Sequence, residues 1–313
     1  MTTITLTDIE AAAERIAPFV RRTPVLEVTA LAEPITPADL SLKLENLQAT
    51  GSFKARGATN KLLSMPAEAL SKGIVTASGG NHGLAVARAA RQAGVAATVL
   101  VTESVTPEKL AKLERWGASV RIAGQIWNEA NEEALQLAEQ TGAVYFHPFA
   151  DPHVIAGQGT AALEFLEDQR DLDVLLVAIG GGGLISGMSI AVKALKPSVR
   201  IIGIEPEGSP TLRASLEAGR VVRLNSVTSQ VATMSCAETD ESVFQIVQRN
   251  VSEVVLVTDD EMRDATRWLW FELGIAADLS GAAAIAALRT GAIHVPKGLK
   301  IGALVCGAGA VEA

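Results

Sequence analysis

The sequence predicts an α/β fold in which mostly parallel sheets are covered by helices, and three observations support this prediction. Short runs rich in Val, Ile and Leu recur along most of the 313 residues, amphipathic segments of helical length separate them, and glycine or proline stands at several boundaries. Nearly continuous apolar strands that alternate with helices are typical of parallel sheets buried on both faces. The length favours two lobes, with one inserted in the other at roughly residues 70 to 145.

The predicted elements follow from short apolar runs and from helical spacing between them. Strands are expected at residues 74–77, 97–101, 120–122, 174–179, 201–204, 254–257 and 301–305. Helices are expected over residues 84–93, 107–116, 128–140 and 184–195, and Pro107 and Gly117 suit the start and the end of the second. Ligands of open α/β sheets bind beyond the carboxyl ends of strands, so the residues just after each strand are candidate site residues.

Composition and charge exclude several classes of protein. A net charge of -8 argues against a nucleic-acid binder, which needs a basic surface. The two cysteines, Cys236 and Cys306, make neither a disulfide framework nor a metal-site spacing, which fits a reducing compartment. The N-terminal residues are charged, unlike a signal peptide, and glycines interrupt the uncharged stretch at residues 174–192. We therefore expect a cytoplasmic protein with no membrane or nucleic-acid partner.

A run of four glycines, Gly180-Gly181-Gly182-Gly183, separates a predicted strand from a helix that begins near Leu184. Successive glycine N–H groups can converge, and a helix N-terminus adds partial positive charge, so this turn predicts a phosphate site. A dinucleotide is an alternative ligand. The strict G-x-G-x-x-G spacing fails, but a looser one ending at Gly187 exists, and Glu205 ends the next strand where a ribose-binding acid would stand. A turn that needs glycine for its conformation alone is the third interpretation.

The lysine that bears most on function is Lys54, in the segment Gly51-Ser52-Phe53-Lys54-Ala55-Arg56-Gly57-Ala58. Most lysines are solvated surface charges. Here the apolar neighbours, a preceding Gly-Ser turn and a following stretch of small residues predict a desolvated amine. Desolvation favours the neutral, nucleophilic form of an amine.

This segment resembles the cofactor-lysine motif of the fold-type II pyridoxal-phosphate enzymes, in particular the serine/threonine dehydratase group that includes threonine ammonia-lyases and serine racemases. Three further segments resemble that group in order and spacing, and the likeness covers nearly the whole chain. They are the asparagine loop Ala77-Ser78-Gly79-Gly80-Asn81-His82-Gly83, the returning segment His147-Pro148-Phe149 with residues 154–160, and the tetraglycine phosphate loop with Leu184.

The resemblance implies a two-domain fold of the tryptophan synthase β type with pyridoxal 5'-phosphate held between the domains. Residues 1–70 and 146–313 would form the large cofactor-binding domain, and residues 71–145 the small domain with the asparagine loop. Lys54 would bind the cofactor as a Schiff base and then take the Cα proton of the substrate. The remaining cofactor contacts would be Phe53, Asn81, Gly180, Gly181, Gly182, Gly183, Leu184 and Cys306.

The same resemblance implies that the substrate carboxylate binds to the asparagine loop, through Ser78, Gly79, Gly80, Asn81 and His82. A packing role is the alternative for His82. Cys306 would face the pyridine nitrogen, where a thiol cannot hold that nitrogen protonated; a small buried residue is the alternative reading.

The sequence departs from the group at four places. Gly79 stands where racemases carry a second serine as acid/base, which favours elimination over racemisation. Glu205 begins the racemase-type metal pattern, but Ser209 and Thr211 follow it, so we expect no metal. The segments Asp278-Leu279-Ser280-Gly281 and Cys306-Gly307-Ala308-Gly309 replace Glu-Pro-Ser-Gly and Cys-Gly-Gly-Asn, both near the cofactor in the group.

We therefore predict a dehydratase that converts L-threonine to 2-oxobutanoate, L-serine to pyruvate, or both, with release of ammonia. The chain stops soon after Cys306, so we expect no C-terminal regulatory domain and a catabolic role. A homo-oligomer, either a dimer or a multiple of it, is the expected assembly. The alternatives are a 3-hydroxyaspartate or phenylserine ammonia-lyase, a serine racemase, a nicotinamide-dependent oxidoreductase, and a homologue that binds the cofactor without turnover.

Overall fold

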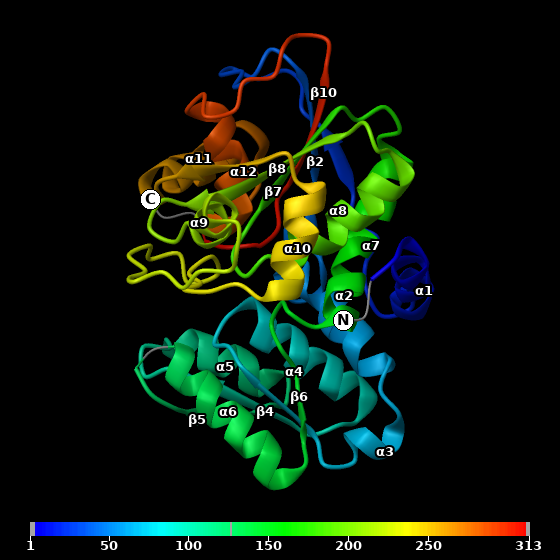
Figure 1. Ribbon diagram of the computed structural model, residues 1–313, viewed down its shortest axis with the longest axis vertical. Coiled ribbons are helices and arrows are strands. Elements are labelled where there is room, and N and C mark those ends of the chain that lie inside the picture. Colours follow the sequence, from blue (N-terminus) through cyan, green and yellow to red (C-terminus); the bar gives the residue numbers. More distant parts are fainter. Residues whose placement is uncertain (1–3, 126, 311–313) are drawn as a thin grey trace.

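The computed structural model describes residues 4–125 and 127–310 and contains two sheets, one above the other in Figure 1. The larger sheet has six strands in the order β1-β2-β10-β7-β8-β9. Every neighbouring pair is parallel except the antiparallel pair of β1 and β2. The six strands are β1 (Val25–Glu27), β2 (Asp39–Lys43), β7 (Val174–Ala178), β8 (Arg200–Pro206), β9 (Glu253–Val257) and β10 (Lys300–Leu304).

The smaller sheet has four parallel strands in the order β5-β4-β3-β6. Its strands are β3 (Ile74–Ala77), β4 (Ala97–Val101), β5 (Ser119–Ile122) and β6 (Val144–Tyr145). We call each sheet with its covering helices a lobe. The helices of the smaller lobe are α3 (Ala67–Leu70), α4 (Asn81–Ala93), α5 (Pro107–Arg115) and α6 (Trp127–Thr141).

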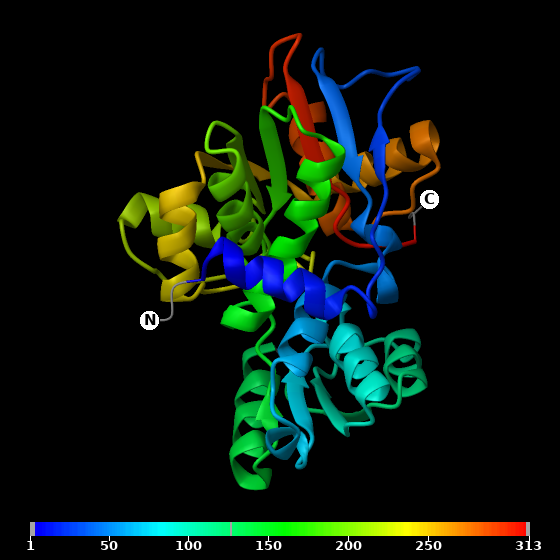
Figure 2. The ribbon, with the colours of Figure 1, turned by 90° about the vertical axis from the view of Figure 1, so that its right-hand side faces the viewer.

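The remaining helices accompany the six-stranded sheet, and Figure 2 shows α1 crossing the molecule at a height between the two sheets. They are α1 (Leu6–Ile16), the 3-10 turns η1 (Glu45–Leu47) and η2 (Ala49–Gly51), α2 (Lys54–Leu63), α7 (Pro152–Asp168), α8 (Gly183–Leu195), α9 (Thr211–Ala218), α10 (Glu241–Asn250), α11 (Asp259–Leu273) and α12 (Leu279–Arg289). Buried strands β7, β8 and β10 with α8 and α12 form the centre of the large core.

Helix α2 packs on both lobes. It lies against α7 so closely that a Cβ atom on Gly157 would stand 2.7 Å from the Cα of Gly57. Its residues Ala58 and Leu62 belong to the core of the smaller lobe, together with Phe146 at the end of β6. Lys54, the first residue of α2, therefore lies on a helix that is fixed by contacts with both lobes.

The predicted strands and helices are present with small shifts at their ends. The helix after β3 begins at Asn81 rather than near residue 84. Strands β1, β2 and β6 were not predicted, because β1 and β6 have only three and two residues and β2 contains a lysine. That lysine, Lys43, is fully buried in an ion-pair network, so its charge does not mark a surface position. No described helix is long and apolar enough to cross a membrane.

Candidate active site

Lys54 begins α2 and presents a partly buried amine. Its Nζ atom donates a hydrogen bond to the carbonyl oxygen of Pro148 at 2.7 Å and lies 5.2 Å from the centre of the Phe53 ring. Desolvation lowers the pKa of Lys54 to about 8, and no carboxylate of the described residues opposes this shift. The predicted desolvated amine is therefore present, with a proton affinity that suits both nucleophilic attack and proton transfer.

The segment before Lys54 is joined to the segment that contains Cys306. The N–H of Phe53 donates to the Cys306 carbonyl at 3.2 Å, and the N–H of Ala308 donates to the Gly51 carbonyl at 2.8 Å. The Cys306 side chain is buried and lies 3.8 Å from the Ser280 hydroxyl. Burial, and then the negative charge of Asp278, raise the pKa of Cys306, so its thiol stays neutral.

The glycine run connects β7 to α8, as the sequence predicted. Among the described residues, no acceptor takes a hydrogen bond from the backbone N–H groups of residues 180–185, which gather at the N-terminus of α8. Gly182 has a φ of 93°, a left-handed conformation that glycine adopts without strain. Free N–H groups at a helix N-terminus form an anion site of the kind that binds phosphate.

Close packing is a second reason for glycine in this run. A Cβ atom on Gly181 would lie 2.1 Å from the Phe149 ring, and one on Gly183 would lie 2.7 Å from the Phe149 carbonyl oxygen. A Cβ atom on Gly180 would lie 2.7 Å from the carbonyl oxygen of Thr233. The run therefore serves both a set of N–H donors without internal acceptors and a close contact with the chain that enters α7.

The asparagine loop connects β3 to α4 and offers a second helix N-terminus. Gly80 is the N-cap residue of α4 without a capping side chain, and its N–H donates to the Ser78 hydroxyl at 3.3 Å. No described group accepts from the N–H groups of Asn81, His82 and Gly83 in the first turn. The loop approaches the glycine run through Thr233, whose methyl group lies 4.0 Å from an ideal Cβ on Gly80.

Two histidines near Lys54 are neutral. Nε2 of His82 lies 3.2 Å from the Phe146 carbonyl oxygen, and its buried Nδ1 has no partner among the described residues. Burial, and then the positive charge of Lys54, lower the pKa of His82 to about 3. Burial likewise lowers the pKa of His147 to about 4. An anion at this loop would therefore meet backbone N–H donors rather than an imidazolium ion.

The carboxylate of Glu205 lies at the N-terminus of a helix. Its carboxylate accepts hydrogen bonds from the N–H groups of Leu212 at 2.8 Å and Arg213 at 2.9 Å, so it stabilises the start of α9. Burial raises the pKa of Glu205 to about 7. Ser209 and Thr211 both donate to the Cys236 carbonyl, and the described residues contain no cluster of three or more His, Cys, Asp or Glu suited to a metal.

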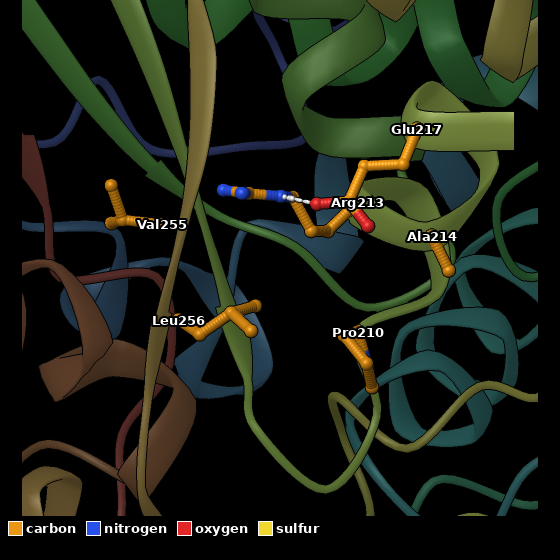
Figure 3. Close-up of a pocket in the computed structure, with 6 residues that line it drawn as sticks. All are labelled: Pro210, Arg213, Ala214, Glu217, Val255 and Leu256. Carbon is orange, nitrogen blue, oxygen red and sulfur yellow. Dashed lines mark hydrogen bonds and ion pairs between the residues drawn. The ribbon is translucent and has the colours of Figure 1, made fainter. Parts of the chain in front are cut away.

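A separate hollow of about 370 Å³ lies between α9 and β9 (Figure 3). Figure 3 shows the Glu217 side chain reaching toward Arg213, with which it pairs at 2.5 Å, and Arg213 also donates to the Val254 carbonyl at 2.7 Å. The charges of Arg213 and Glu217 at this hollow are thus partly compensated by each other. None of the lysine, glycine-run or asparagine-loop residues lines it.

Comparison with known proteins identifies the family. The family described as "Pyridoxal-phosphate dependent enzyme" matches residues 16–307, which is most of the chain. The chain belongs to this family. Its cofactor is therefore pyridoxal phosphate, and the nicotinamide alternative suggested by the glycine spacing and Glu205 is wrong.

Relatives within the family are similar over nearly the whole chain. An L-threonine ammonia-lyase of Thermotoga maritima is 41% identical over 285 residues, which cover 91% of this chain and 71% of the relative. A phenylserine dehydratase of Ralstonia pickettii is 36% identical over 97% of this chain and 94% of its own. Among solved structures, maize serine racemase superposes with a TM-score of 0.93 at 33% identity, covering 98% of this chain and 94% of that one. The predicted fold-type II architecture is confirmed.

The residues of the site fit pyridoxal phosphate. The aldehyde of this cofactor requires an accessible amine of lowered pKa, which Lys54 provides. Its phosphate requires several N–H donors without internal acceptors, which residues 180–185 provide without a lysine or arginine. The buried Cys306 thiol, which stays neutral, would suit a partner of the pyridine nitrogen.

Sequence reasoning did not assign the contacts of several residues that shape this site, and it did not single out Thr233. Pro148 receives the hydrogen bond of Lys54, Phe149 packs on the glycine run, and Thr233 lies between the two glycine-containing loops. The imidazole of His147 accepts from the N–H groups of Phe149 and Ala150 and so fixes the turn that presents Pro148. The returning segment was recognised in the sequence, but nothing in its spacing indicated which of its atoms would reach Lys54.

Proposed function

We propose that this enzyme removes water and then ammonia from a β-hydroxy-α-amino acid, with L-threonine as the first candidate substrate and 2-oxobutanoate as its product. The observation that carries the proposal is the amine of Lys54, which has a pKa lowered to about 8 and begins a helix packed on both lobes. The names of the relatives support the same class of reaction, because an L-threonine ammonia-lyase and a phenylserine dehydratase are 41% and 36% identical to the chain.

The residues divide the work between binding and proton transfer. When bound, pyridoxal phosphate supplies an electron-withdrawing ring that makes the Cα–H bond of an attached amino acid acidic. The N–H groups of residues 180–185 hold the cofactor phosphate. The Lys54 amine would hold the cofactor, and as a neutral amine it would also take the proton from Cα of the substrate.

The asparagine loop binds the substrate carboxylate in this proposal. The N–H groups of Asn81, His82 and Gly83 lack internal acceptors, and the Ser78 hydroxyl lies in the same loop. The carboxylate therefore orients the substrate so that its Cα faces Lys54. Donors fixed by a helix N-terminus need no rearrangement when the anion arrives.

Gly79 favours elimination over racemisation. Inversion at Cα needs a second acid or base on the face opposite Lys54, and glycine has no side chain that could carry a proton. An ideal Cβ atom on Gly79 would lie 3.2 Å from a methyl group of Val105, so the space for a side chain is also limited. The chain resembles maize serine racemase in overall structure, but Gly79 departs from the motif that racemases of this group carry.

Several broader properties belong to the same proposal. We propose a large cofactor-binding domain of residues 1–70 and 146–313 and a small domain of residues 71–145. We also propose a cytoplasmic homo-oligomer, a dimer in the simplest case, which binds neither nucleic acid nor membrane. L-Serine, phenylserine and 3-hydroxyaspartate are the further substrates to be compared with L-threonine.

A visible absorption spectrum of the purified protein, recorded before and after borohydride, tests the proposal. We expect an absorption band that borohydride removes, with a pyridoxyl group attached to Lys54 by peptide mass analysis, and formation of 2-oxobutanoate from L-threonine. Lys54→Ala should abolish both, whereas Lys61→Ala, on the same helix but paired with Asp151 at 2.8 Å, should retain both.

A protein that cannot be reconstituted with pyridoxal phosphate would refute the proposed function. A protein that binds the cofactor through Lys54 but acts on none of the four hydroxy-amino acids would be the catalytically silent homologue instead.

A further inference from the structure

Asp278 uses its two carboxylate oxygens for two different purposes. It is the N-cap residue of α12, and its Oδ1 accepts hydrogen bonds from the Gly281 N–H at 2.7 Å and from the Ser280 hydroxyl at 2.7 Å. Its Oδ2 accepts from Nδ2 of Asn81 at 3.0 Å. A helix cap needs only the first oxygen. The second oxygen therefore links the larger lobe to the asparagine loop of the smaller lobe.

A carboxylate at this position determines which way the Asn81 amide faces. An ionised carboxylate only accepts hydrogen bonds, so it must face the NH₂ side of Asn81, and the amide oxygen then points elsewhere. A neutral partner with both a donor and an acceptor would permit either orientation of the amide. Asp278 thus removes the twofold ambiguity that an asparagine side chain otherwise has.

The surrounding backbone holds Asp278 in place. Its N–H donates to the Gly307 carbonyl at 3.0 Å, and a Cβ atom on Gly307 would lie 2.5 Å from its carboxylate. A Cβ atom on Gly309 would lie 2.7 Å from the Cα of Asp278. The two segments that depart from the family sequence, at residues 278–279 and at residues 308–309, are therefore in contact through Asp278 and Gly309.

We propose that Asp278 is a positioning residue for Asn81. It acts through the orientation of the Asn81 amide and not by contact with the substrate. The inference rests on the proposed function, in which Asn81 binds the substrate carboxylate, and on the contact of Asn81 with the cofactor that the family resemblance implies. It predicts that losing the second oxygen of Asp278 weakens cofactor and substrate binding even when the helix cap is kept.

The variant Asp278→Asn tests this inference, because asparagine caps a helix as well as aspartate does. Asp240→Asn is the matched control. Asp240 caps α10 and accepts from the N–H and the hydroxyl of Ser242, as Asp278 does from the residues after it, but it has no bond to the asparagine loop. Asp278→Ser, a shorter cap, is the second variant. The readouts are the Kd of pyridoxal phosphate, the KM and kcat for L-threonine, and the Tm.

We expect both substitutions of Asp278 to raise the Kd of pyridoxal phosphate or the KM by about tenfold, the size of a lost charge-assisted hydrogen bond. Asp240→Asn should change neither by more than about twofold, with a Tm close to that of Asp278→Asn. In an Asn81→Ala background, Asp278→Asn should have no further effect on Kd or KM, since its partner is already absent.

Two results would overturn the inference while the proposed function stands: Kd and KM values for Asp278→Asn that match those of Asp240→Asn, or losses that multiply in the double variant with Asn81→Ala. A wild-type protein that binds no cofactor through Lys54 would overturn the proposed function and this inference together.

Discussion

Replacing Arg56 with methionine would remove the centre of a buried ion-pair network, two residues along α2 from the lysine that defines the site. The Arg56 guanidinium donates to both oxygens of Glu45 at 2.7 and 2.8 Å and to both oxygens of Glu164 at 2.7 and 2.8 Å. The Arg56 and Glu45 side chains are 1% and 0% exposed. Glu164 would keep its pairing with Lys43 at 2.7 Å, but Glu45 would lose the one ion pair that it makes among the described residues.

The expected loss follows from leaving a buried carboxylate without its cation. Breaking a buried pair by removing one partner costs about 3–5 kcal/mol. The entropy of unfolding of a 313-residue chain is about 0.66 kcal/mol/K, so this loss corresponds to a decrease in Tm of about 5–8 °C. The guanidinium also lowers the pKa of Glu164. A lowered carboxylate pKa stabilises the fold above the ordinary glutamate pKa of about 4.3 and ceases to do so as the pH falls, so the difference between the two proteins should narrow on acidification.

Differential scanning calorimetry at pH 7 and at lower pH would measure both effects. Arg22→Met is the matched control, because Arg22 also pairs with two carboxylates, at 2.8 and 2.5 Å, but its side chain is 50% exposed. An exposed pair contributes about 0–1 kcal/mol, so this control should lose less than about 2 °C. If Arg56→Met had the same Tm as Arg22→Met, the reasoning that the network stabilises α2 would be wrong.

Three further predictions concern the site itself. The first concerns the rate at which the cofactor-free protein binds pyridoxal phosphate, followed by absorbance. This rate should rise with pH to a plateau with a midpoint near 8, because only the neutral Lys54 amine attacks the cofactor aldehyde. A midpoint near 10.5 would contradict the lowered pKa of Lys54. Gly181→Ala should raise the Kd of the cofactor at least about tenfold and lower the Tm, because its Cβ would overlap the Phe149 ring. Gly117→Ala is the control, because its Cβ would meet no atom within 4 Å. It should leave the Kd unchanged and lower the free energy of unfolding by about 1 kcal/mol, since residue 117 has a positive φ. Gly79→Ser should lower kcat/KM for L-threonine without producing D-allothreonine, the product of inversion at Cα, because its side chain would be crowded. Appearance of D-allothreonine in a chiral assay would show that this position alone decides between elimination and inversion.

Local sequence was sufficient wherever a structural requirement is written in adjacent residues. Apolar runs such as the one at β7 predict buried parallel strands because both faces of each strand must be covered. The four glycines after β7 predict an anion site because converging N–H groups need a backbone without side chains. Lys54 was identified from a motif of eight residues, and its desolvated amine was expected from its apolar neighbours.

What only the tertiary structure decided are the contacts between residues far apart in the chain. Lys43 interrupts the apolar pattern of β2, and for this reason the strand was not predicted. The lysine can be buried because its charge is compensated by Glu164, 121 residues away. Asp278 and Asn81 are 197 residues apart, and the atom that receives the lysine hydrogen bond belongs to Pro148, 94 residues from Lys54. A sequence pattern indicates which charged or polar side chains need a partner, because apolar neighbours in the chain predict that these side chains are buried. The identity of that partner depends on how the two sheets and α2 pack together, which no local pattern encodes.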